Sequence, residues 1–364
     1  MTYLTLPGLI DPHVHLRDPG QTEKEDFLTG TSAALVGGYT TVIDMPNNKT
    51  PITTAEKLEE KIQSARKKIV CDVGFYFGSM GNNLAEFPKV SSKVLGLKLF
   101  LNHTTGNYLL SLGFLEKIFK AWPNPPTGGS PILFHAENET FDLVLEVLKK
   151  SPRPVHLCHI STSYELKKVI EAKGQGLPVT CGVTPHHLFL DLNDLHHLSS
   201  FGMMKPPLQS RKDVEFLWKN LKEIDVIESD HAPHTIEEKQ SDPPAGGQYY
   251  GVPGLETTLP LLLTAAAEGK LTVNDIVRLS HDGPKRIFLP YLNDVDHLRD
   301  SRVEIDPDEE WMIQNKNLLT KCKWSPFDGW KVKGRVKRVF LRGEKVFENG
   351  KVLAALGFGK ILGN

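Results

Sequence analysis

The sequence has 364 residues, a formal net charge of −1 at pH 7 and a pI of about 6.9. This length allows an α/β barrel of about 250 residues and a smaller module. No basic stripe is interleaved with aromatic residues, so nucleic acid is not an expected partner. The four cysteines are too scattered for a disulfide framework, and no signal peptide or long apolar stretch predicts a membrane anchor. We therefore expect a cytoplasmic protein in a reducing compartment.

Eight short apolar runs bounded by turn signals predict β-strands, at residues 6–12, 40–45, 71–77, 96–101, 131–135, 155–159, 178–183 and 226–230. Apolar spacings of three and four predict helices at 24–35, 54–67, 83–90, 109–121, 141–149, 164–172, 211–221 and 255–267, of which 83–90 has the weakest pattern. Strict alternation predicts parallel strands, which can close into a TIM-type (β/α)8 barrel over residues 6–290. A doubly wound open sheet is the alternative, but no glycine-rich phosphate-binding motif follows the first strand.

The pattern changes after the predicted barrel. Residues 272–280 and 284–288 are predicted to be helical, and from residue 303 the chain alternates as in β-strands, with a hairpin signal at Asn349-Gly350. We expect residues 1–5 and 303–356 to form a small β module packed beside the barrel. Only residues 1–5 precede the first predicted strand, which fits a domain excised from a longer multi-enzyme chain.

Polar side chains stand where the predicted strands end, which is where such a barrel places its active site. His13 and His15 alternate, so both imidazoles lie on one side of the backbone and can share a metal ion. A lone histidine at a strand end is more often a structural residue. Here, however, six candidate ligands occur on five strands, which favours a metal site: His13, His15, Lys98, His135, His159 and Asp230.

Two cations near these ligands indicate further chemistry. Lys98 is flanked by apolar residues in a strand expected to be central, where an unpaired ammonium is costly. Its reaction with carbon dioxide would give a carbamate, whose two oxygens can bridge two metal ions. Arg17 lies one further step along the alternation of His13 and His15, and a guanidinium can bind an anion with two hydrogen bonds. An anionic substrate is therefore expected.

The motifs together are recognisable: His13-Val14-His15-Leu16-Arg17, Met45-Pro46-Asn47, Gly96-Leu97-Lys98-Leu99, His135-Ala136-Glu137, Cys158-His159 and Ser229-Asp230-His231-Ala232-Pro233-His234. The chain resembles the amidohydrolase superfamily and, within it, the dihydroorotases. It is most similar to the dihydroorotase domain of CAD-type multifunctional proteins, over nearly the whole chain. The resemblance implies a zinc-dependent, reversible cyclisation of N-carbamoyl-L-aspartate to L-dihydroorotate in de novo pyrimidine biosynthesis. It also implies a homodimer and fusion to other pathway enzymes in the full-length protein.

Matching motif positions imply roles for individual residues. Two Zn2+ ions would be bound by His13, His15, His135, His159, Asp230 and carboxylated Lys98. A bridging hydroxide would attack the ring amide, and Asp230 would act as general acid and base. Expected substrate contacts are Arg17, Asn47 and His234 for the carboxylate, the backbone at Tyr250 and Gly251 over the ring, Thr104 and Thr105 from a closing loop, and Lys205, whose role is open.

One departure from the family pattern concerns a third metal. The animal domain carries a glutamate that helps to hold it, whereas this chain has Gly182 at that position, which argues against a third zinc. Cys158 is then either an extra metal contact or only a buried thiol.

Two other functions remain open. Another cyclic-amide hydrolase, a dihydropyrimidinase or allantoinase, would share the metal ions, but its neutral substrates lack the carboxylate that Arg17 would bind. A degenerate, non-catalytic domain kept as an assembly scaffold would not need the intact ligand set.

Overall fold

The computed structural model describes residues 3–104, 108–124, 130–241, 249–290 and 298–363. Its parallel strands form two sheets. The first has the order β2-β3-β4, with β2 at Leu9–Val14, β3 at Tyr39–Asp44 and β4 at Asp72–Phe75. The second has the order β10-β9-β8-β7-β6-β5, with bounds Phe77–Gly78 (β5), Leu97–Phe100 (β6), Ile132–His135 (β7), Val155–Leu157 (β8), Val179–Val183 (β9) and Val226–Ile227 (β10). Parallel strands joined by helices are thus confirmed.

Short backbone contacts connect the two parallel sheets. Between β4 and β5 lies only Tyr76, whose N–H donates to the Asp44 carbonyl. An isolated parallel bridge joins Val14 to His231, and the His15 N–H donates to the His231 carbonyl at 2.8 Å. These contacts bring the carboxyl end of β2 beside the segment that follows β10.

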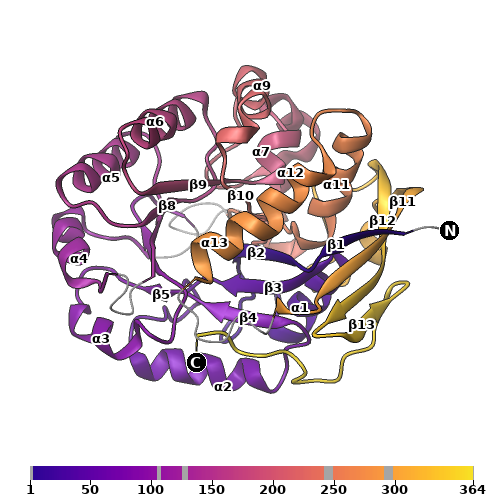
Figure 1. Ribbon diagram of the computed structural model, residues 1–364, viewed down its shortest axis with the longest axis horizontal. Helices are drawn as coiled ribbons and strands as arrows, with labels where there is room; N and C mark the ends of the chain where they lie inside the picture. The colour runs from indigo at the N-terminus through magenta and orange to yellow at the C-terminus, as the bar shows by residue number, and fades with distance from the viewer. Residues whose placement is uncertain (1–2, 105–107, 125–129, 242–248, 291–297, 364) are drawn as a thin grey trace.

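Helices lie outside the parallel strands (Figure 1). Those that connect or follow the strands are α1 (Phe27–Val36), α2 (Ala55–Arg66), α3 (Phe87–Val90), α4 (Leu115–Ala121), α5 (Glu139–Lys150), α6 (Ser163–Gly174), α9 (Arg211–Lys219) and α11 (Leu255–Ala267). Several begin where a side-chain oxygen accepts a hydrogen bond from the first turn, as Asp26 does for α1 and Thr162 for α6. The predicted helix 109–121 is shorter than expected, because a 3-10 turn at Leu112–Phe114 precedes α4.

Short helices fill several loops. Three of them were not predicted from the sequence: α7 (Pro185–Phe189), α8 (Leu195–Leu198) and α10 (Ile236–Gln240). Two others lie where helices were predicted at 272–280 and 284–288, namely α12 (Val273–Val277) and α13 (Gly283–Phe288). A π-helix lies at Arg278–Asp282, and further 3-10 turns lie at Leu84–Glu86, Leu192–Asp194, Ser199–Gly202, Leu221–Glu223 and Asn315–Asn317. The predicted helix 272–280 therefore consists of α12 and most of the π-helix. Segments of four or five residues are too short for a helical period to be read from sequence.

The third sheet is antiparallel, with the order β1-β11-β12-β13-β14, and β11 to β13 lie at one side of Figure 1 in orange and yellow. Its strands are β1 (Leu4–Pro7), β11 (Arg302–Met312), β12 (Lys331–Leu341), β13 (Glu344–Glu348) and β14 (Lys351–Val352). The single strand predicted at 6–12 is wrong, since β1 and β2 belong to different sheets and are separated by Gly8. A Cβ at Gly8 would lie 2.3 Å from Oγ1 of Thr40, so the chain needs glycine where it passes β3.

The C-terminal segment returns to the parallel strands. Arg342 Nη1 lies 2.5 and 2.6 Å from the two carboxylate oxygens of Asp72, the first residue of β4. Lys360 donates its backbone N–H to Asp72, and Ile361 forms a parallel bridge with Val73. The antiparallel sheet is thus tied to β4 by the residues that follow its strands.

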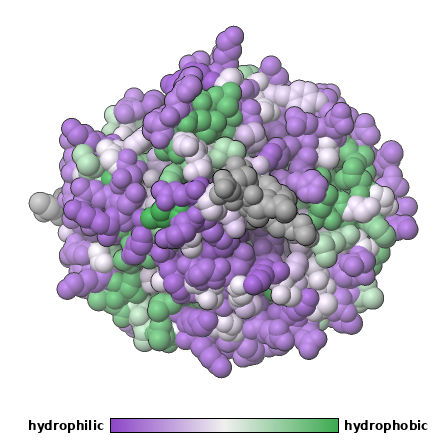
Figure 2. Space-filling view, turned by 180° about the vertical axis from the view of Figure 1, so that it is seen from behind, coloured by the Kyte–Doolittle hydropathy of each residue, from purple (hydrophilic) through white to green (hydrophobic). Residues whose placement is uncertain are grey.

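The surface and the cysteines add two observations. Across the described ranges, no helix has both the length and the apolar character needed to cross a bilayer. Figure 2 shows a mostly hydrophilic face, with apolar residues in separate patches. The four cysteines are buried and unbridged, as expected from their spacing: Cys71, Cys158, Cys181 and Cys322.

Candidate functional site

One pocket at the carboxyl ends of the parallel strands gathers most of the residues singled out from the sequence. Its empty volume is about 400 Å³, including the part open to solvent. It is lined by His13, His15, Arg17, Asn47, Phe100, Thr104, His135, His159, Lys205, Asp230, Ala232, Tyr250 and Gly251. The sequence did not single out Phe100 and Ala232 as site residues. Lys98 and Cys158 do not line this pocket and are buried.

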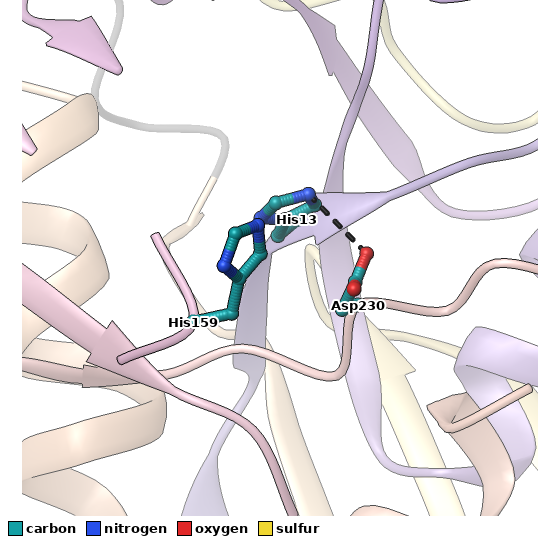
Figure 3. Close-up of side chains that lie close together, drawn as sticks. All are labelled: His13, His159 and Asp230. Carbon is teal, nitrogen blue, oxygen red and sulfur yellow. Dashed lines mark ion pairs between the residues drawn. The ribbon is translucent and has the colours of Figure 1, made fainter. Parts of the chain in front are cut away.

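Two imidazoles and one carboxylate converge on one side of the pocket. Oδ1 of Asp230 lies 3.3 Å from Nε2 of His13 and 3.1 Å from Nε2 of His15. Figure 3 shows His13 and Asp230 directed toward each other, with His159 beside them. Potential ligand atoms of His13, His159 and Asp230 all lie within 4.8 Å of one another. Such a buried group of nitrogen and oxygen atoms suits a zinc ion.

His135 and His159 form the other side of this cluster. Nδ1 of His135 and Nε2 of His159 are 3.0 Å apart, and Nε2 of His135 lies 3.1 Å from Oε1 of Glu137. Among the described atoms, the buried Nδ1 of His159 has no hydrogen-bond partner. Buried polar atoms normally have partners. A metal ion bound by these rings fits the facing nitrogens.

Burial sets the protonation of these groups. Burial is the main reason why the pKa of His13 is lowered to about 4, and the positive charge of Lys98 lowers this pKa further. Burial also lowers the pKa of His15, His135 and His159, so all four rings are neutral near pH 7. Neutral imidazoles have a lone pair for a metal ion. Burial raises the pKa of Asp230 above its usual value.

Lys98 differs from the other fully buried lysine of the parallel-strand region. Its Nζ lies 3.0 Å from Sγ of Cys158 and 4.9 Å from the ring centroid of Phe100. Within the described residues, no carboxylate lies within ion-pair distance of it. By contrast, Nζ of Lys61 lies 2.8 Å from Oδ2 of Asp44. Burying an ammonium without a counterion is costly, so the position of Lys98 calls for a partner that balances its charge.

The backbone is strained at three residues of the pocket. Arg17, His159 and Asp230 have positive φ values of 61°, 40° and 43°. A non-glycine residue in this region costs on the order of 1–3 kcal/mol, and such residues concentrate at functional sites. The fold therefore holds Arg17, His159 and Asp230 in backbone conformations that a regular β-strand does not have.

Arg17 is buried beside the cluster. Its Nε donates to the carbonyl of Pro233 at 3.2 Å, and Nη2 lies 3.4 Å from Nε2 of His234. His234 is fully buried and does not line the pocket; its Nε2 is 3.0 Å from the Tyr250 carbonyl, and burial lowers its pKa to about 3. His234 thus lies behind Arg17 and connects it to the backbone at Tyr250.

Other expected substrate contacts line the same pocket. Oδ1 of Asn47 lies 2.8 Å from Nδ1 of His15, and Nζ of Lys205 lies 5.4 Å from the centroid of the Tyr250 ring. Gly251 has φ 135°, and a Cβ there would lie 2.5 Å from the carbonyl oxygen of Ala232. Thr104 lines the pocket, whereas Thr105 lies outside the described residues.

Sequence reasoning missed the carboxylates that support the candidate ligands. Glu137 contacts His135, and Glu238 contacts both His234 and Lys24, whose Nζ lies 2.7 Å from Oε1 of Glu238. Glu228 is fully buried beside His13. The argument used for Lys98, a charge inside an apolar run, would have identified Glu228 as well.

The side chain of Glu228 lies in the space that a side chain at Gly182 would occupy. A Cβ at Gly182 would lie 2.6 Å from the carboxyl carbon of Glu228. Ligand atoms of His13, Cys158 and Glu228 lie within 4.8 Å of one another. The segment after β10 therefore places a carboxylate in the space beside Gly182.

Comparisons with known proteins agree with this geometry. A family model described as "Amidohydrolase family" matches residues 4–181. The dihydroorotase of Pyrococcus horikoshii is 38% identical over 370 aligned positions, which cover 96% of this chain and 82% of that protein. The chain belongs to the dihydroorotase family. The multifunctional protein CAD of Squalus acanthias is 43% identical over 362 positions, covering 98% of the chain but only 15% of that protein.

Two solved structures show that this fold does not determine activity by itself. L-Hydantoinase (dihydropyrimidinase) from Arthrobacter aurescens superposes with a TM-score of 0.90 at 26% identity, covering 99% of this chain and 89% of that one. An inactive dihydroorotase-like domain of a CAD-like multifunctional protein from Chaetomium thermophilum superposes with a TM-score of 0.82 at 26% identity, covering 99% of both chains. Within the dihydroorotase family, the side chains of the pocket must therefore distinguish an enzyme from an inactive domain.

Proposed function

We propose that this chain is a dihydroorotase, which interconverts N-carbamoyl-L-aspartate and L-dihydroorotate in de novo pyrimidine biosynthesis. The observation that carries this proposal is the convergence of four neutral histidines, Asp230 and buried Lys98 beside the cation of Arg17. Membership of the family supports hydrolysis of a cyclic amide. The position of Arg17 supports a substrate that carries a carboxylate.

The metal centre would contain two zinc ions. His13, His15 and Asp230 would hold one, His135 and His159 the other, and carboxylated Lys98 would bridge them. The neutral rings and the uncompensated burial of Lys98 support this assignment. When bound, the two ions would supply an activated water molecule and polarise the amide carbonyl. Cys158 lies 3.0 Å from Lys98 and remains a candidate further contact.

Asp230 would move the proton. In hydrolysis its carboxylate accepts a proton from the attacking water and delivers it to the ring nitrogen that leaves. Its pKa is raised by burial, which makes the protonated form accessible at this step. Ring closure reverses the sequence: the ureido nitrogen bonds to the carboxyl carbon and gives its proton to Asp230, which delivers it to the oxygen that leaves as water.

Arg17 would orient the substrate through its carboxylate, with Asn47 beside it and His234 supporting it from behind. The backbone at Tyr250 and Gly251 would cover the ring. Thr104, Thr105 and Lys205 would provide further substrate contacts. A buried guanidinium left without an anion is penalised, so a neutral hydantoin or dihydropyrimidine would bind less well.

Three structural proposals accompany the activity. Contacts at Tyr76 and between Val14 and His231 support closure of the parallel strands into a (β/α)8 barrel over residues 6–290, with residues 1–5 and 303–356 as the β module. Four buried free thiols support a cytoplasmic location. Similarity to multifunctional relatives supports fusion to other enzymes of the pathway. We also propose that the chain forms a homodimer, because the family resemblance implies one.

Metal removal tests the proposed activity. The purified chain should hydrolyse L-dihydroorotate and cyclise N-carbamoyl-L-aspartate, lose both activities when a chelator removes zinc, and recover them when zinc is restored. The hydantoinase relative makes dihydropyrimidinase the second candidate. A zinc-loaded protein that opens dihydrouracil and leaves dihydroorotate intact would replace our assignment with that one. A chain that binds no zinc would indicate an inactive domain.

A further inference from the structure

Glu228 is a buried carboxylate that the proposed reaction does not use. Its exposed fraction is 0%, and it follows β10 two residues before Asp230. Oε2 lies 3.3 Å from Nδ1 of His13 and 3.5 Å from Nε2 of His156, while Oε1 accepts a hydrogen bond from the backbone N–H of His159. One carboxylate therefore contacts the side chain of one proposed ligand and the backbone of another.

The fold makes room for this carboxylate at Gly182. Gly182 is the fourth of the five residues of β9, a strand between β8 and β10, and a Cβ there would be 2.6 Å from both the carboxyl carbon and Oε1 of Glu228. Glycine inside a strand often marks such a close approach. Any side chain at position 182 would displace Glu228 from His13.

His156 also faces the carboxylate of Glu228. The Thr180 hydroxyl, which donates to the Val155 carbonyl at 3.2 Å, also lies 2.9 Å from Nδ1 of His156, and Nε2 of the same ring faces Glu228. Both Glu228 and His156 are fully buried. Polar groups from β9, β8 and the segment after β10 thus lead to Nδ1 of His13 on β2.

We propose that Glu228 is a positioning residue for the metal centre. Its carboxylate lies 3.3 Å from Nδ1 of His13, and this contact favours the tautomer that carries its proton on Nδ1 and leaves the Nε2 lone pair to face Asp230 and the metal ion. Histidines that bind metal ions usually donate their second N–H in this way, and removal of the acceptor weakens metal binding. The inference rests on the metal centre proposed above.

The test measures zinc affinity by competition with a chelator. Glu228→Gln should bind zinc about 10- to 100-fold more weakly. The cobalt(II)-substituted variant should also show a shifted visible spectrum, because the donor strength of His13 changes. Glu256→Gln is the matched control, since Glu256 is another buried glutamate that accepts backbone hydrogen bonds, here from Leu319 and Thr320. Its zinc affinity and cobalt spectrum should match those of the wild-type chain.

Gly182→Ala provides an independent test that leaves Glu228 in the chain. The added methyl group should displace the carboxylate and weaken zinc binding, but it should cause no further loss when combined with Glu228→Ala. Gly182→Ala also decides the question if Glu228→Gln does not fold.

Three outcomes have distinct meanings. Wild-type zinc affinity and an unchanged cobalt spectrum in both Glu228→Gln and Gly182→Ala would overturn the inference. Loss of one zinc equivalent, with the affinities of the others unchanged, would overturn it too, because Glu228 would then be a ligand. A wild-type chain that binds no zinc would instead refute the metal centre of the proposed function.

Discussion

Arg17 is a buried guanidinium whose contacts leave room for a substrate anion. Its hydrogen-bonding partners are the carbonyl of Pro233 and the ring of His234, and neither carries a negative charge. Arg17→Gln should lower kcat/KM for L-dihydroorotate by about 100-fold or more, because truncation of one partner of a buried charge pair costs roughly 2–5 kcal/mol. Steady-state kinetics and zinc analysis of the same sample check this. Retained substrate affinity with lost zinc would mean that Arg17 is structural.

Lys98 and Lys61 form a natural comparison, because both are fully buried and only Lys61 has a carboxylate partner, Asp44. Lys98→Ala should lose bound zinc and activity together, since it removes the proposed bridge. Lys61→Met should lower the melting temperature but keep the zinc content, because it leaves Asp44 buried without its ammonium. Metal analysis and thermal unfolding of both variants distinguish these effects. Full activity in Lys98→Ala would contradict the carbamate bridge.

At the residue scale, the sequence predicted side chains that stand at strand ends, because the alternation of a strand and the geometry of a barrel place them on one rim. It did not predict Glu228 as the partner of His13. That contact depends on which strands are neighbours and on the space above Gly182, and neither property is local in sequence. The position of His234 behind Arg17 also follows from packing alone.

At the scale of elements, helix α11 is tied to the segment before β12 by one carboxylate. Glu256, in its first turn, accepts hydrogen bonds from the backbone N–H groups of Leu319 and Thr320. Burial raises the pKa of Glu256 from 4.5 to about 7 in the folded chain. The folded state therefore binds more protons than the unfolded state between these values. Its contribution to stability is present below pH 4.5 and is lost as the pH rises through 7.

Glu256→Gln tests this linkage, because glutamine keeps an acceptor oxygen but does not titrate. Between pH 5 and 8, the free energy of unfolding of the wild-type chain should fall relative to the variant by about 2–3 kcal/mol. Denaturant unfolding of both proteins at the two pH values measures the difference. Parallel curves would show that Glu256 does not titrate in this range.

Element positions followed from periodicity, but some boundaries did not. The predicted strand 71–77 is divided at Tyr76, whose N–H bonds to Asp44 of β3, whereas the N–H of Phe77 bonds to Gly96 beside β6. The predicted strand 6–12 is divided at Gly8. In both cases the division depends on which neighbouring strand is paired, and the apolar pattern does not record that choice.

At the scale of the whole molecule, Arg342 joins the antiparallel sheet to the parallel strands through the buried carboxylate of Asp72. Arg342→Ala should lower the free energy of unfolding by about 3 kcal/mol, the lower end of the cost of breaking a buried ion pair, because the arginine is partly exposed. Zinc content should not change, since Asp72 starts β4 and the metal centre lies beyond the strand ends. Equal thermal stability of variant and wild type would show that this contact does not hold the sheets together.

Alternating strands and helices sufficed to predict parallel strands surrounded by helices, and the change of pattern near residue 303 predicted the antiparallel sheet. The return of Ile361 to β4 was not predictable, because a single bridge leaves no periodic signal. The fold resembles both a hydantoinase and an inactive domain. The side chains of the pocket must therefore determine which reaction the protein catalyses.

The most direct test of the account is therefore a substrate comparison with one zinc-loaded preparation of the wild-type chain. We predict that kcat/KM for L-dihydroorotate exceeds that for dihydrouracil by about 100-fold or more, because only the first substrate presents a carboxylate to Arg17. Equal turnover of the two substrates, or preference for dihydrouracil, would contradict the assignment.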